Sequence, residues 1–178
     1  VFVDEFGHPD YTLHRPAAYD AAILDTQALK SVARLHPSWI CFGTLHSMDP
    51  RAHQLTQALI ETNPKALRLY DVNLRKNSYR SDLVEKYLHT ADLVKINEQE
   101  AFWLSNQFGL TKSWAEFCHE TANRFNCQIV CVTLGEDGCC LLNSGKFVKT
   151  SGYSVDVVDT VGAGDAFTAG LIHGIDQN

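Results

Sequence analysis

Residues 158–170, Val-Asp-Thr-Val-Gly-Ala-Gly-Asp-Ala-Phe-Thr-Ala-Gly, join a valine-rich segment to a run of small and apolar residues. This pattern predicts a strand that ends at Asp159, a tight turn, and a helix that opens at Asp165. The N–H groups of such a turn converge on one point, and the helix dipole favours negative charge there. Gly162 and Gly164 lack the side chains that would keep an anion away from those donors. The stretch therefore predicts an anion site beside a carboxylate.

A carboxylate beside an anion site suits a base that must lie next to a phosphoryl group during its transfer. The simpler interpretation is a tight turn with Asp165 as an ordinary residue of the first helical turn. The stretch resembles the C-terminal signature of the ribokinase-type (pfkB) carbohydrate kinases, which phosphorylate a sugar or nucleoside hydroxyl from ATP. The resemblance implies that Asp165 is the catalytic base and that the backbone of Gly162, Ala163 and Gly164 forms the anion hole.

Composition narrows the class of protein. The 178 residues are 45% hydrophobic and 20% charged, which is typical of a globular domain with a sizeable core. The net charge of −6, without a basic run, disfavours nucleic acid and anionic membranes as partners. We expect neither a membrane helix nor a signal peptide.

The six cysteines do not have the spacing of a zinc site, so we expect none, and a reducing cytoplasm is the predicted location. Cys41, Cys131 and either Cys139 or Cys140 fall in apolar runs, where cysteine usually acts as a small buried hydrophobe.

Strands and helices alternate along the chain. We expect a hairpin within 1–15, strands over 38–43, 66–72, 91–96 and 128–134, a second hairpin of 139–143 with 146–150, and helices over 26–35, 50–61, 81–89, 97–108 and 112–125. The continuously apolar strand 38–43 has the pattern of a parallel strand buried on both faces. The alternation predicts a single α/β domain over 1–178, a three-layer αβα fold with a mostly parallel sheet. The resemblance makes this a ribokinase-like fold, with 1–15 as remnants of a small β lid.

Ligands of such sheets bind beyond the carboxyl ends of the strands, and polar residues follow several predicted strands. The segment Asp71-Val72-Asn73-Leu74-Arg75 can be read as an ordinary polar loop. It also resembles the Asp-x-Asn-x-Arg segment of fructokinase-like and 2-keto-3-deoxygluconate kinase-like members. The resemblance implies that Arg75, with Asn73, contacts the substrate, since a guanidinium can grip a carboxylate or neighbouring hydroxyls. Arg15 is a further substrate candidate, although Leu13 replaces the family's tyrosine and a solvated arginine is the alternative.

Asn97 and Glu100 have the spacing of a capping box, and this structural role can be true by itself. The pair also matches the family's Asn-x-x-Glu motif, which orders magnesium-bound water and phosphate. A carboxylate at that place would hold Mg²⁺ largely through water, as this ion prefers.

The segment from Thr133 to Gly138 contains two glycines three residues apart, which alone indicate only a turn. It resembles the family's Thr-x-Gly-x-x-Gly nucleotide loop. The resemblance implies that Thr133 offers a hydroxyl to ATP phosphate and that the loop residues Gly135, Glu136 and Gly138 approach the nucleotide. Asp159 and Val161 match positions that contact a monovalent cation in relatives, which implies a K⁺ site.

The resemblance therefore implies an ATP- and Mg²⁺-dependent kinase that phosphorylates a hydroxyl of a hexose or keto-sugar acid, as fructokinases do. The alternatives are a 2-keto-3-deoxygluconate kinase, a nucleoside kinase of the same family, and a nucleotide-binding fragment without catalysis. The last stays open because the chain looks like the C-terminal two-thirds of a member without its very end. A homodimer through the lid strands is also implied. The sequence has no P-loop and lacks the third glycine of a dinucleotide fingerprint.

Overall fold

The computed structural model describes residues 2–3, 9–10, 17–75, 78–111, 113–157 and 160–177. A six-stranded sheet lies at the centre of the fold, with strands in chain order from β3 to β8. Its strands are β3 (Trp39–Gly43), β4 (Leu67–Asp71), β5 (Leu93–Asn97), β6 (Ile129–Thr133), β7 (Cys139–Asn143) and β8 (Lys146–Thr150). The first four are parallel, and β7 and β8 are added antiparallel. The predicted α/β class with a mostly parallel sheet is confirmed.

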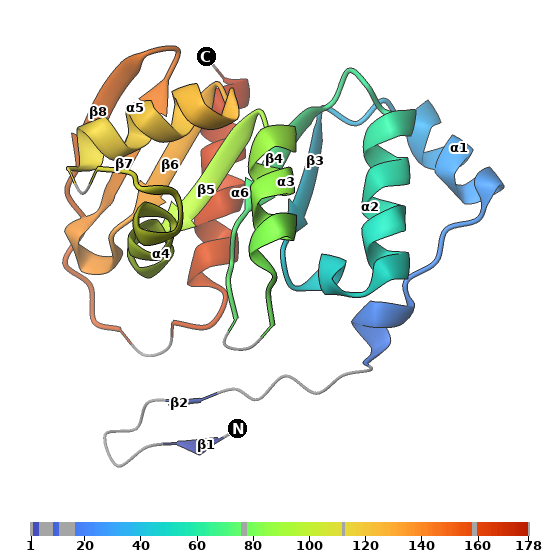
Figure 1. Ribbon diagram of the computed structural model, residues 1–178, viewed down its shortest axis with the longest axis horizontal. Coiled ribbons are helices and arrows are strands. Elements are labelled where there is room, and N and C mark those ends of the chain that lie inside the picture. Colours follow the sequence, from blue (N-terminus) through green and yellow to red (C-terminus); the bar gives the residue numbers. More distant parts are fainter. Residues whose placement is uncertain are drawn as a thin grey trace.

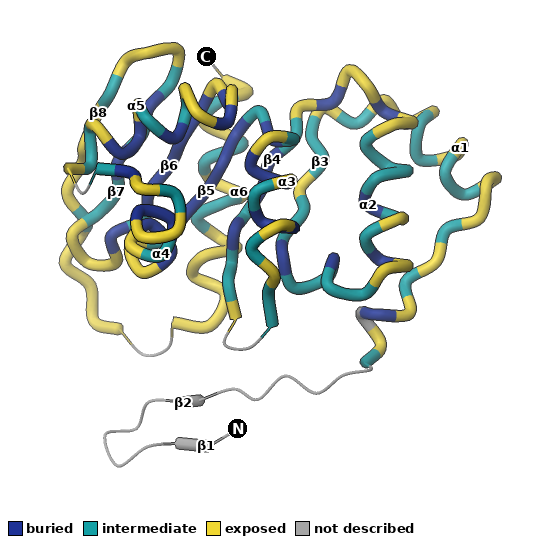
Figure 2. Tube along the Cα trace, in the orientation of Figure 1, coloured by how far each residue is buried: buried dark blue, intermediate teal, exposed yellow. Residues whose placement is uncertain are grey.

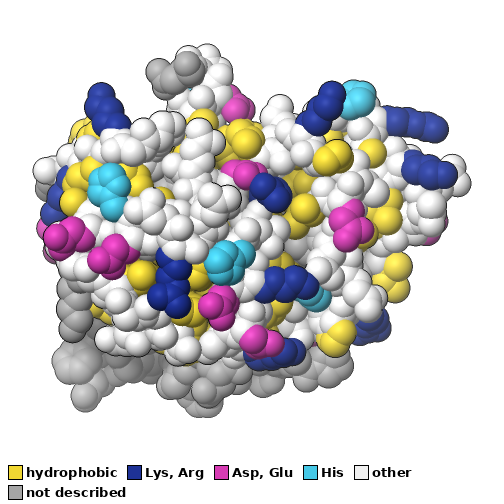
Figure 3. All heavy atoms as spheres, turned by 45° about the horizontal axis from the view of Figure 1, so that its top comes forward, with side chains coloured by type: hydrophobic (Ala, Val, Ile, Leu, Met, Phe, Trp, Pro, Cys, Tyr) yellow, Lys and Arg dark blue, Asp and Glu magenta, His cyan; other side chains and the backbone are white. Residues whose placement is uncertain are grey.

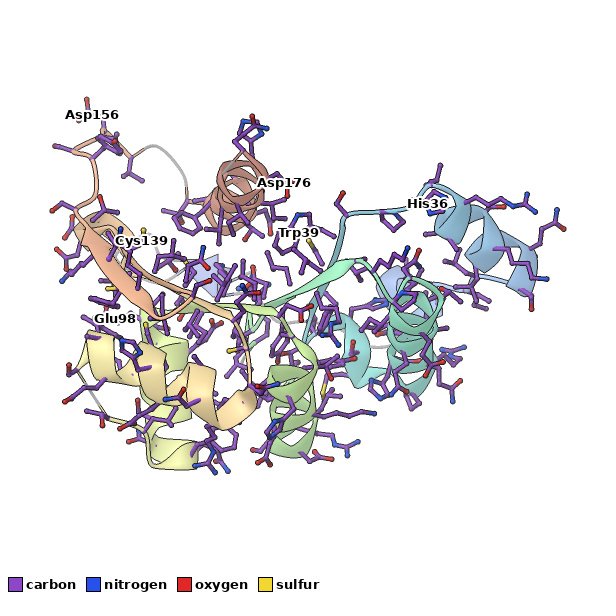
Figure 4. The ribbon with its side chains drawn as sticks, turned by 90° about the horizontal axis from the view of Figure 1, so that it is seen from above. His36, Trp39, Glu98, Cys139, Asp156 and Asp176 are labelled. Carbon is purple, nitrogen blue, oxygen red and sulfur yellow. The ribbon has the colours of Figure 1, made fainter. Side chains whose placement is uncertain are left out.

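Helices cover both faces of this sheet, as Figures 1 and 4 show. One face carries the crossover helices, and the opposite face carries the last helix of the described chain. The helices are α1 (Thr26–Arg34), α2 (Pro50–Thr62), α3 (Ser81–Thr90), α4 (Glu98–Phe108), α5 (Trp114–Phe125) and α6 (Ala163–Asp176), with short 3-10 turns η1 (Ala18–Ala21), η2 (His46–Met48) and η3 (Gly135–Asp137). Of these, α1 packs beside α2, and α6 is the helix on the opposite face. The result is the predicted three-layer arrangement.

The core lies mainly between the sheet and the crossover helices, where the tube of Figure 2 is dark blue. Its largest buried side chains include Tyr70 and Tyr87, whose rings pack edge to face at 5.4 Å. A smaller apolar cluster on the other face joins Leu69, Leu93 and Ile129 to one side of α6. Because side chains alternate along a strand, residues two apart from this cluster also face α6.

Capping residues set several helix starts. The Asp25 carboxylate accepts the N–H of Ala28 at 2.7 Å and caps α1. Asp49 caps α2 in the same way, and Pro50 occupies the first turn, where its missing N–H costs nothing.

Three expectations about the sheet and its last connection need correction. Helix α6 begins at Ala163, two residues before the predicted start, because Gly162 adopts the left-handed conformation and serves as its N-cap. Residues 151–157 are not a strand in the structure, although the sequence predicts one that includes Val155 and Val157. Both valines lie exposed, so the alternating apolar pattern there has no buried face to fill. Residues 158–159 lie outside the described part of the chain.

The third correction concerns β3, which is an edge strand and is not buried on both faces. Its central residue Cys41 is exposed, against the expectation of a buried cysteine. Cys131 and Cys140 lie on inner strands and are buried as expected. The N-terminal hairpin pairs β1 (Phe2–Val3) with β2 (Pro9–Asp10), antiparallel as predicted. The sequence predicts its second strand over 11–15, which lie outside the described residues, and the structure pairs 9–10 instead.

The surface mixes charges of both signs. On the face seen in Figure 3, acidic and basic side chains are interspersed. Within the described ranges, every helix is too short or too polar to cross a membrane.

Candidate active site

The first turn of α6 is built by a glycine and a short loop. Gly162 has φ 79°, a conformation that favours glycine, and its carbonyl accepts the N–H of Ala166 at 2.9 Å. The N–H of Ala163 donates to the carbonyl of Thr160 at 3.1 Å, so this amide already has a partner. The other amides of a first helical turn have no carbonyl partner within the helix. Asp165 is the third residue of α6 and is exposed.

Two oppositely charged residues of the sheet lie beneath this turn. Asp71 ends β4 and is paired in register with Lys95 of β5. The Lys95 Nζ lies 3.2 and 3.1 Å from the two oxygens of Asp71. Burial raises the pKa of Asp71, the Lys95 ammonium opposes this rise, and the negative charge of Asp165 adds to it. Gly164, the residue before Asp165, lies against this pair, because a Cβ atom added to it would lie 3.4 Å from the Lys95 Nζ.

Asn97 and Thr133 are also neighbours, because they are partners in the β5–β6 register. Both lie at the carboxyl ends of their strands, where the sequence predicts ligand contacts. The Thr133 hydroxyl lies 3.4 Å from the carbonyl oxygen of Ile96, a long hydrogen bond that leaves the group able to turn to another partner.

Glu100 joins two segments of this edge. Its carboxylate accepts the N–H of Asn97 at 2.9 Å, and the Asn97 side chain accepts the N–H of Glu100 at 2.9 Å. The predicted capping box is therefore present. The other Glu100 oxygen accepts the N–H of Leu74 at 2.8 Å, which ties α4 to the loop after β4. Burial raises the pKa of Glu100, and the two main-chain donors act in the opposite direction.

The residues around Glu100 fit a magnesium ion held through water. Each Glu100 oxygen keeps a second lone pair beyond the main-chain donor that it accepts. The described part of the chain contains no group of three or more acidic, histidine or cysteine side chains that could hold a metal directly. Mg²⁺ commonly keeps several waters and uses one or two carboxylates together with substrate phosphates. The single carboxylate of Glu100 agrees with this coordination preference of Mg²⁺.

The loop from Thr133 to Gly138 is the tight connection between β6 and β7. Gly135 and Gly138 have φ values of 60° and 94°, which explains why glycine occurs at both positions. The N–H of Leu134 donates to the carbonyl of Gly138 at 2.8 Å and closes the loop. The Glu136 side chain is exposed at its tip.

The predicted substrate residues lie near the start of α4. Asn73 has φ 39°, and Arg75 lines a hollow of about 180 Å³ together with Asn97 and Glu100. The structure thus brings Arg75 to the two residues of the capping box. Val161 is exposed, at 71%. Arg15 and Asp159 lie outside the described residues, so their predicted roles stay predictions.

Two residues at the contact between α6 and the sheet were not singled out by the sequence analysis. Lys95 is a charged residue inside the apolar run of β5, and that position was the available signal. Thr168 looks like one small residue among several in α6, but its hydroxyl reaches Asp71 at 3.5 Å.

Comparison with known proteins shows the family of this chain. Residues 17–178 match the family described as "pfkB family carbohydrate kinase". The chain belongs to the pfkB family of carbohydrate kinases. The match confirms the family resemblance, and the matched residues include both the sheet and the first turn of α6.

Individual pfkB relatives give the same result. A fructokinase of Escherichia coli is 28% identical over 147 residues, which cover 79% of this chain and 47% of that protein. The crystal structure of a double-mutant Vibrio cholerae fructokinase, with fructose, ADP and potassium bound, matches with a TM-score of 0.64 and 26% identity over 76% of this chain and 44% of that one. Aminoimidazole riboside kinase of Salmonella enterica, with aminoimidazole riboside and an ATP analogue bound, matches with a TM-score of 0.59 and 27% identity over 75% and 46%. The chain spans about half the length of the curated relatives that it matches.

Proposed function

We propose that this protein is an ATP-dependent sugar kinase that transfers the γ-phosphoryl group to a hydroxyl of a hexose or keto-sugar acid. The observation that supports the proposal is the first turn of α6, which carries Asp165 and lies against Lys95 of β5 and Asp71 of β4. In this proposal the sugar hydroxyl donates to the Asp165 carboxylate, which accepts the proton as the oxygen attacks phosphorus.

The negative charge that grows on the phosphoryl oxygens needs donors aimed at it. We assign this role to the turn of Gly162, Ala163 and Gly164, because a helix N-terminus stabilises an anion without reorganisation. The Ala163 amide would exchange its bond with Thr160 for one to the phosphoryl group. A carboxylate in a first helical turn is a weak base, which is tolerable when the transition state is loose and the proton leaves late.

We assign nucleotide contacts to the adjacent ends of β5 and β6. Thr133 and Asn97 would donate to phosphate oxygens, and the backbone of Gly135, Glu136 and Gly138 would lie along the nucleotide. Glu100 would hold Mg²⁺ through water bound to the ion. When bound, such an ion neutralises negative charge on the phosphates. The Val161 carbonyl and Asp159 would hold a K⁺ ion; the potassium in the fructokinase crystal structure supports this assignment.

We assign substrate recognition to Arg75, Asn73 and Arg15. The relatives named fructokinase favour a hexose. A second candidate is a riboside or nucleoside hydroxyl, which the similarity to aminoimidazole riboside kinase supports. We further propose that residues 1–15 belong to a β lid through which two copies could pair; the β1–β2 pairing supports the lid. A cytoplasmic location goes with this function.

The test is a coupled-enzyme assay for ADP release by the full-length protein with Mg-ATP. Fructose, 2-keto-3-deoxygluconate, ribose and adenosine serve as separate acceptors. We expect turnover with fructose or the keto-sugar acid and little with adenosine. Turnover with adenosine alone would favour the nucleoside kinase. ATP binding without phosphorylation of any acceptor would contradict the proposal and favour a nucleotide-binding module.

A further inference from the structure

Lys95 is a buried cation in an apolar strand. It is the central residue of β5, where Leu93, Val94 and Ile96 are fully buried. The Lys95 side chain is 8% exposed, and its ammonium lies 3.1 and 3.2 Å from the two oxygens of Asp71. A buried charge is costly unless it is paired, so a lysine at this place requires a partner and a reason.

The ion pair lies directly against the first turn of α6. A Cβ atom added to Gly164 would lie 3.4 Å from the Lys95 Nζ. The Thr168 hydroxyl, one turn later, lies 2.9 Å from the Gly164 carbonyl oxygen and 3.5 Å from an Asp71 oxygen. The ammonium, the Asp71 carboxylate and this hydroxyl therefore connect β4 and β5 to the turn that carries Asp165.

The rest of α6 is held by other contacts. Its C-terminal end is anchored by Trp39 of β3, whose Nε1 donates to Asp176 at 2.8 Å; Figure 4 shows both residues on the α6 side of the sheet. Its middle packs on the sheet through Leu171 and Ile172. No described residue of α6 is fully buried, so apolar packing alone holds this helix weakly. Polar contacts at the N-terminal end then decide where the first turn lies.

Electrostatics give the ion pair a second consequence. Asp71 lies beneath the same turn that carries the Asp165 carboxylate. The Lys95 ammonium is bound to Asp71, which offsets the charge of the carboxylate beneath the turn. Without that ammonium, Asp71 would be a buried carboxyl group with no cationic partner beneath the turn, which disfavours this position of the turn.

We infer that Lys95 is a positioning residue for the proposed phosphoryl transfer, acting through Asp71 to hold the first turn of α6 over the ends of β4 and β5. The inference rests on the proposed function. It assigns to Lys95 no contact with substrate or nucleotide.

Amide hydrogen exchange tests the positioning without any need for activity. We expect Lys95→Met to raise exchange at Ala166 and Phe167 at least ~10-fold and to leave Ile172 and Ile175 within ~2-fold. Lys149→Met, which removes an exposed lysine of β8, is the matched control and should change neither group. An equal rise at all amides would indicate a general loss of stability. No rise at Ala166 and Phe167 would indicate that Lys95 does not hold the first turn of α6. Either result overturns the inference.

A milder variant decides the question if Lys95→Met does not fold. Thr168→Val removes the hydroxyl whose single hydrogen the Gly164 carbonyl and the Asp71 carboxylate share, and we expect it to raise exchange at the same two amides. Thr90→Val, which removes a similar hydroxyl bond to Lys86 at the end of α3, is its control. If Thr168→Val behaves like Thr90→Val, the inference is wrong.

Kinetics of the full-length protein separate positioning from simple structural support. We expect Lys95→Met to lower kcat ~10- to 100-fold while KM for ATP changes less than ~3-fold, because a displaced turn misaligns the transfer more than it weakens binding. A wild-type protein that phosphorylates no acceptor would contradict the proposed function alone. The exchange result would still show whether Lys95 holds the first turn of α6. A variant with unchanged kcat beside an active wild type would contradict the role of Lys95 alone.

Discussion

The carboxylate of Glu100 and the main-chain N–H of Leu74 lie 2.8 Å apart, and this bond joins the first turn of α4 to the loop that carries Arg75. The second oxygen of the same carboxylate accepts the N–H of Asn97. One buried side chain thus fixes the relative position of a proposed metal-binding turn and a proposed substrate loop. These bonds are compatible with the proposed metal-binding role of Glu100, because each oxygen can accept a further donor.

Replacement of Glu100 by glutamine tests this junction. Glutamine has one acceptor oxygen, so it leaves one main-chain N–H facing an amide NH₂ group. We expect the free energy of unfolding to fall by about 1–3 kcal/mol, the usual cost of an unsatisfied buried donor. Urea titration measures it, with exposed Glu98→Gln in the same turn as control. Equal stability of the two variants would show that Glu100 does not hold the loop.

Gly138 tests the shape of the proposed nucleotide loop. A Cβ atom built on Gly138 would overlap the Thr150 carbonyl oxygen and the main chain of Gly152. Gly145, with φ 78°, has no atom within 4 Å of its added Cβ and is the matched control. We expect Gly138→Ala to lower stability by about 3 kcal/mol or more and to weaken ATP binding, and Gly145→Ala to cost about 1 kcal/mol. Thermal unfolding and calorimetric ATP titration give both values. Similar losses for the two alanines would contradict the described loop.

The ion pair of Arg68 and Asp92 predicts a dependence of stability on pH. The guanidinium donates to Asp92 at 2.8 and 2.6 Å, and the Arg68 N–H donates at 2.9 Å. Burial alone would raise the pKa of Asp92, but these donors outweigh it and hold that pKa below its ordinary value. A lowered carboxyl pKa stabilises the fold above the unfolded-state pKa, and this contribution disappears as the pH falls through the folded-state pKa.

We therefore expect Asp92→Asn to reduce the free energy of unfolding by about 1–2 kcal/mol at pH 7, a figure discounted for partial exposure. The difference from wild type should shrink as the pH falls below about 4. Urea titrations at several pH values measure it, with Glu61→Gln, an exposed carboxylate of α2, as control. A difference that stays constant with pH would contradict the assignment.

The hydrogen bond between Trp39 and Asp176 predicts that substitutions at these two residues have coupled effects on stability. Trp39→Phe keeps an aromatic ring but removes the donor of their 2.8 Å hydrogen bond. Asp176→Asn keeps an acceptor oxygen but removes its charge. We expect each change to cost about 1 kcal/mol and the double variant to cost less than the sum. A double-mutant cycle by chemical unfolding measures the coupling. Strict additivity would mean that the bond contributes nothing.

Much of the fold follows from local sequence signals. Asp25, Asp49 and Asn97 each precede a helix and cap it, and a side-chain acceptor before a helical run is a strong start signal in the sequence. The apolar runs that became β5 and β6 are buried as their composition predicts.

The errors arise where a residue's surroundings decide the outcome. The apolar segment around Cys41 became an edge strand, and edge position is a property of the whole sheet. The start of α6 depends on the left-handed conformation of Gly162, which glycine permits and does not require.

The candidate site was predictable only in part. Its strand-end residues follow from the topology, and Asn97 and Thr133 are neighbours in the sheet. The pairing of Lys95 with Asp71 was not predictable, since it needs the register of two strands and the position of a helix distant in sequence. A lysine within an apolar strand shows only that some partner is required.

The central claim is that Asp165 accepts the proton of the acceptor hydroxyl at the first turn of α6. Single-turnover phosphoryl transfer by the full-length protein, with Asp165→Asn against wild type, tests it most directly. The account predicts a loss of rate of about 10²- to 10⁴-fold with ATP affinity nearly unchanged, because asparagine keeps the shape of the turn and cannot take a proton. Transfer at the wild-type rate by Asp165→Asn would contradict the account.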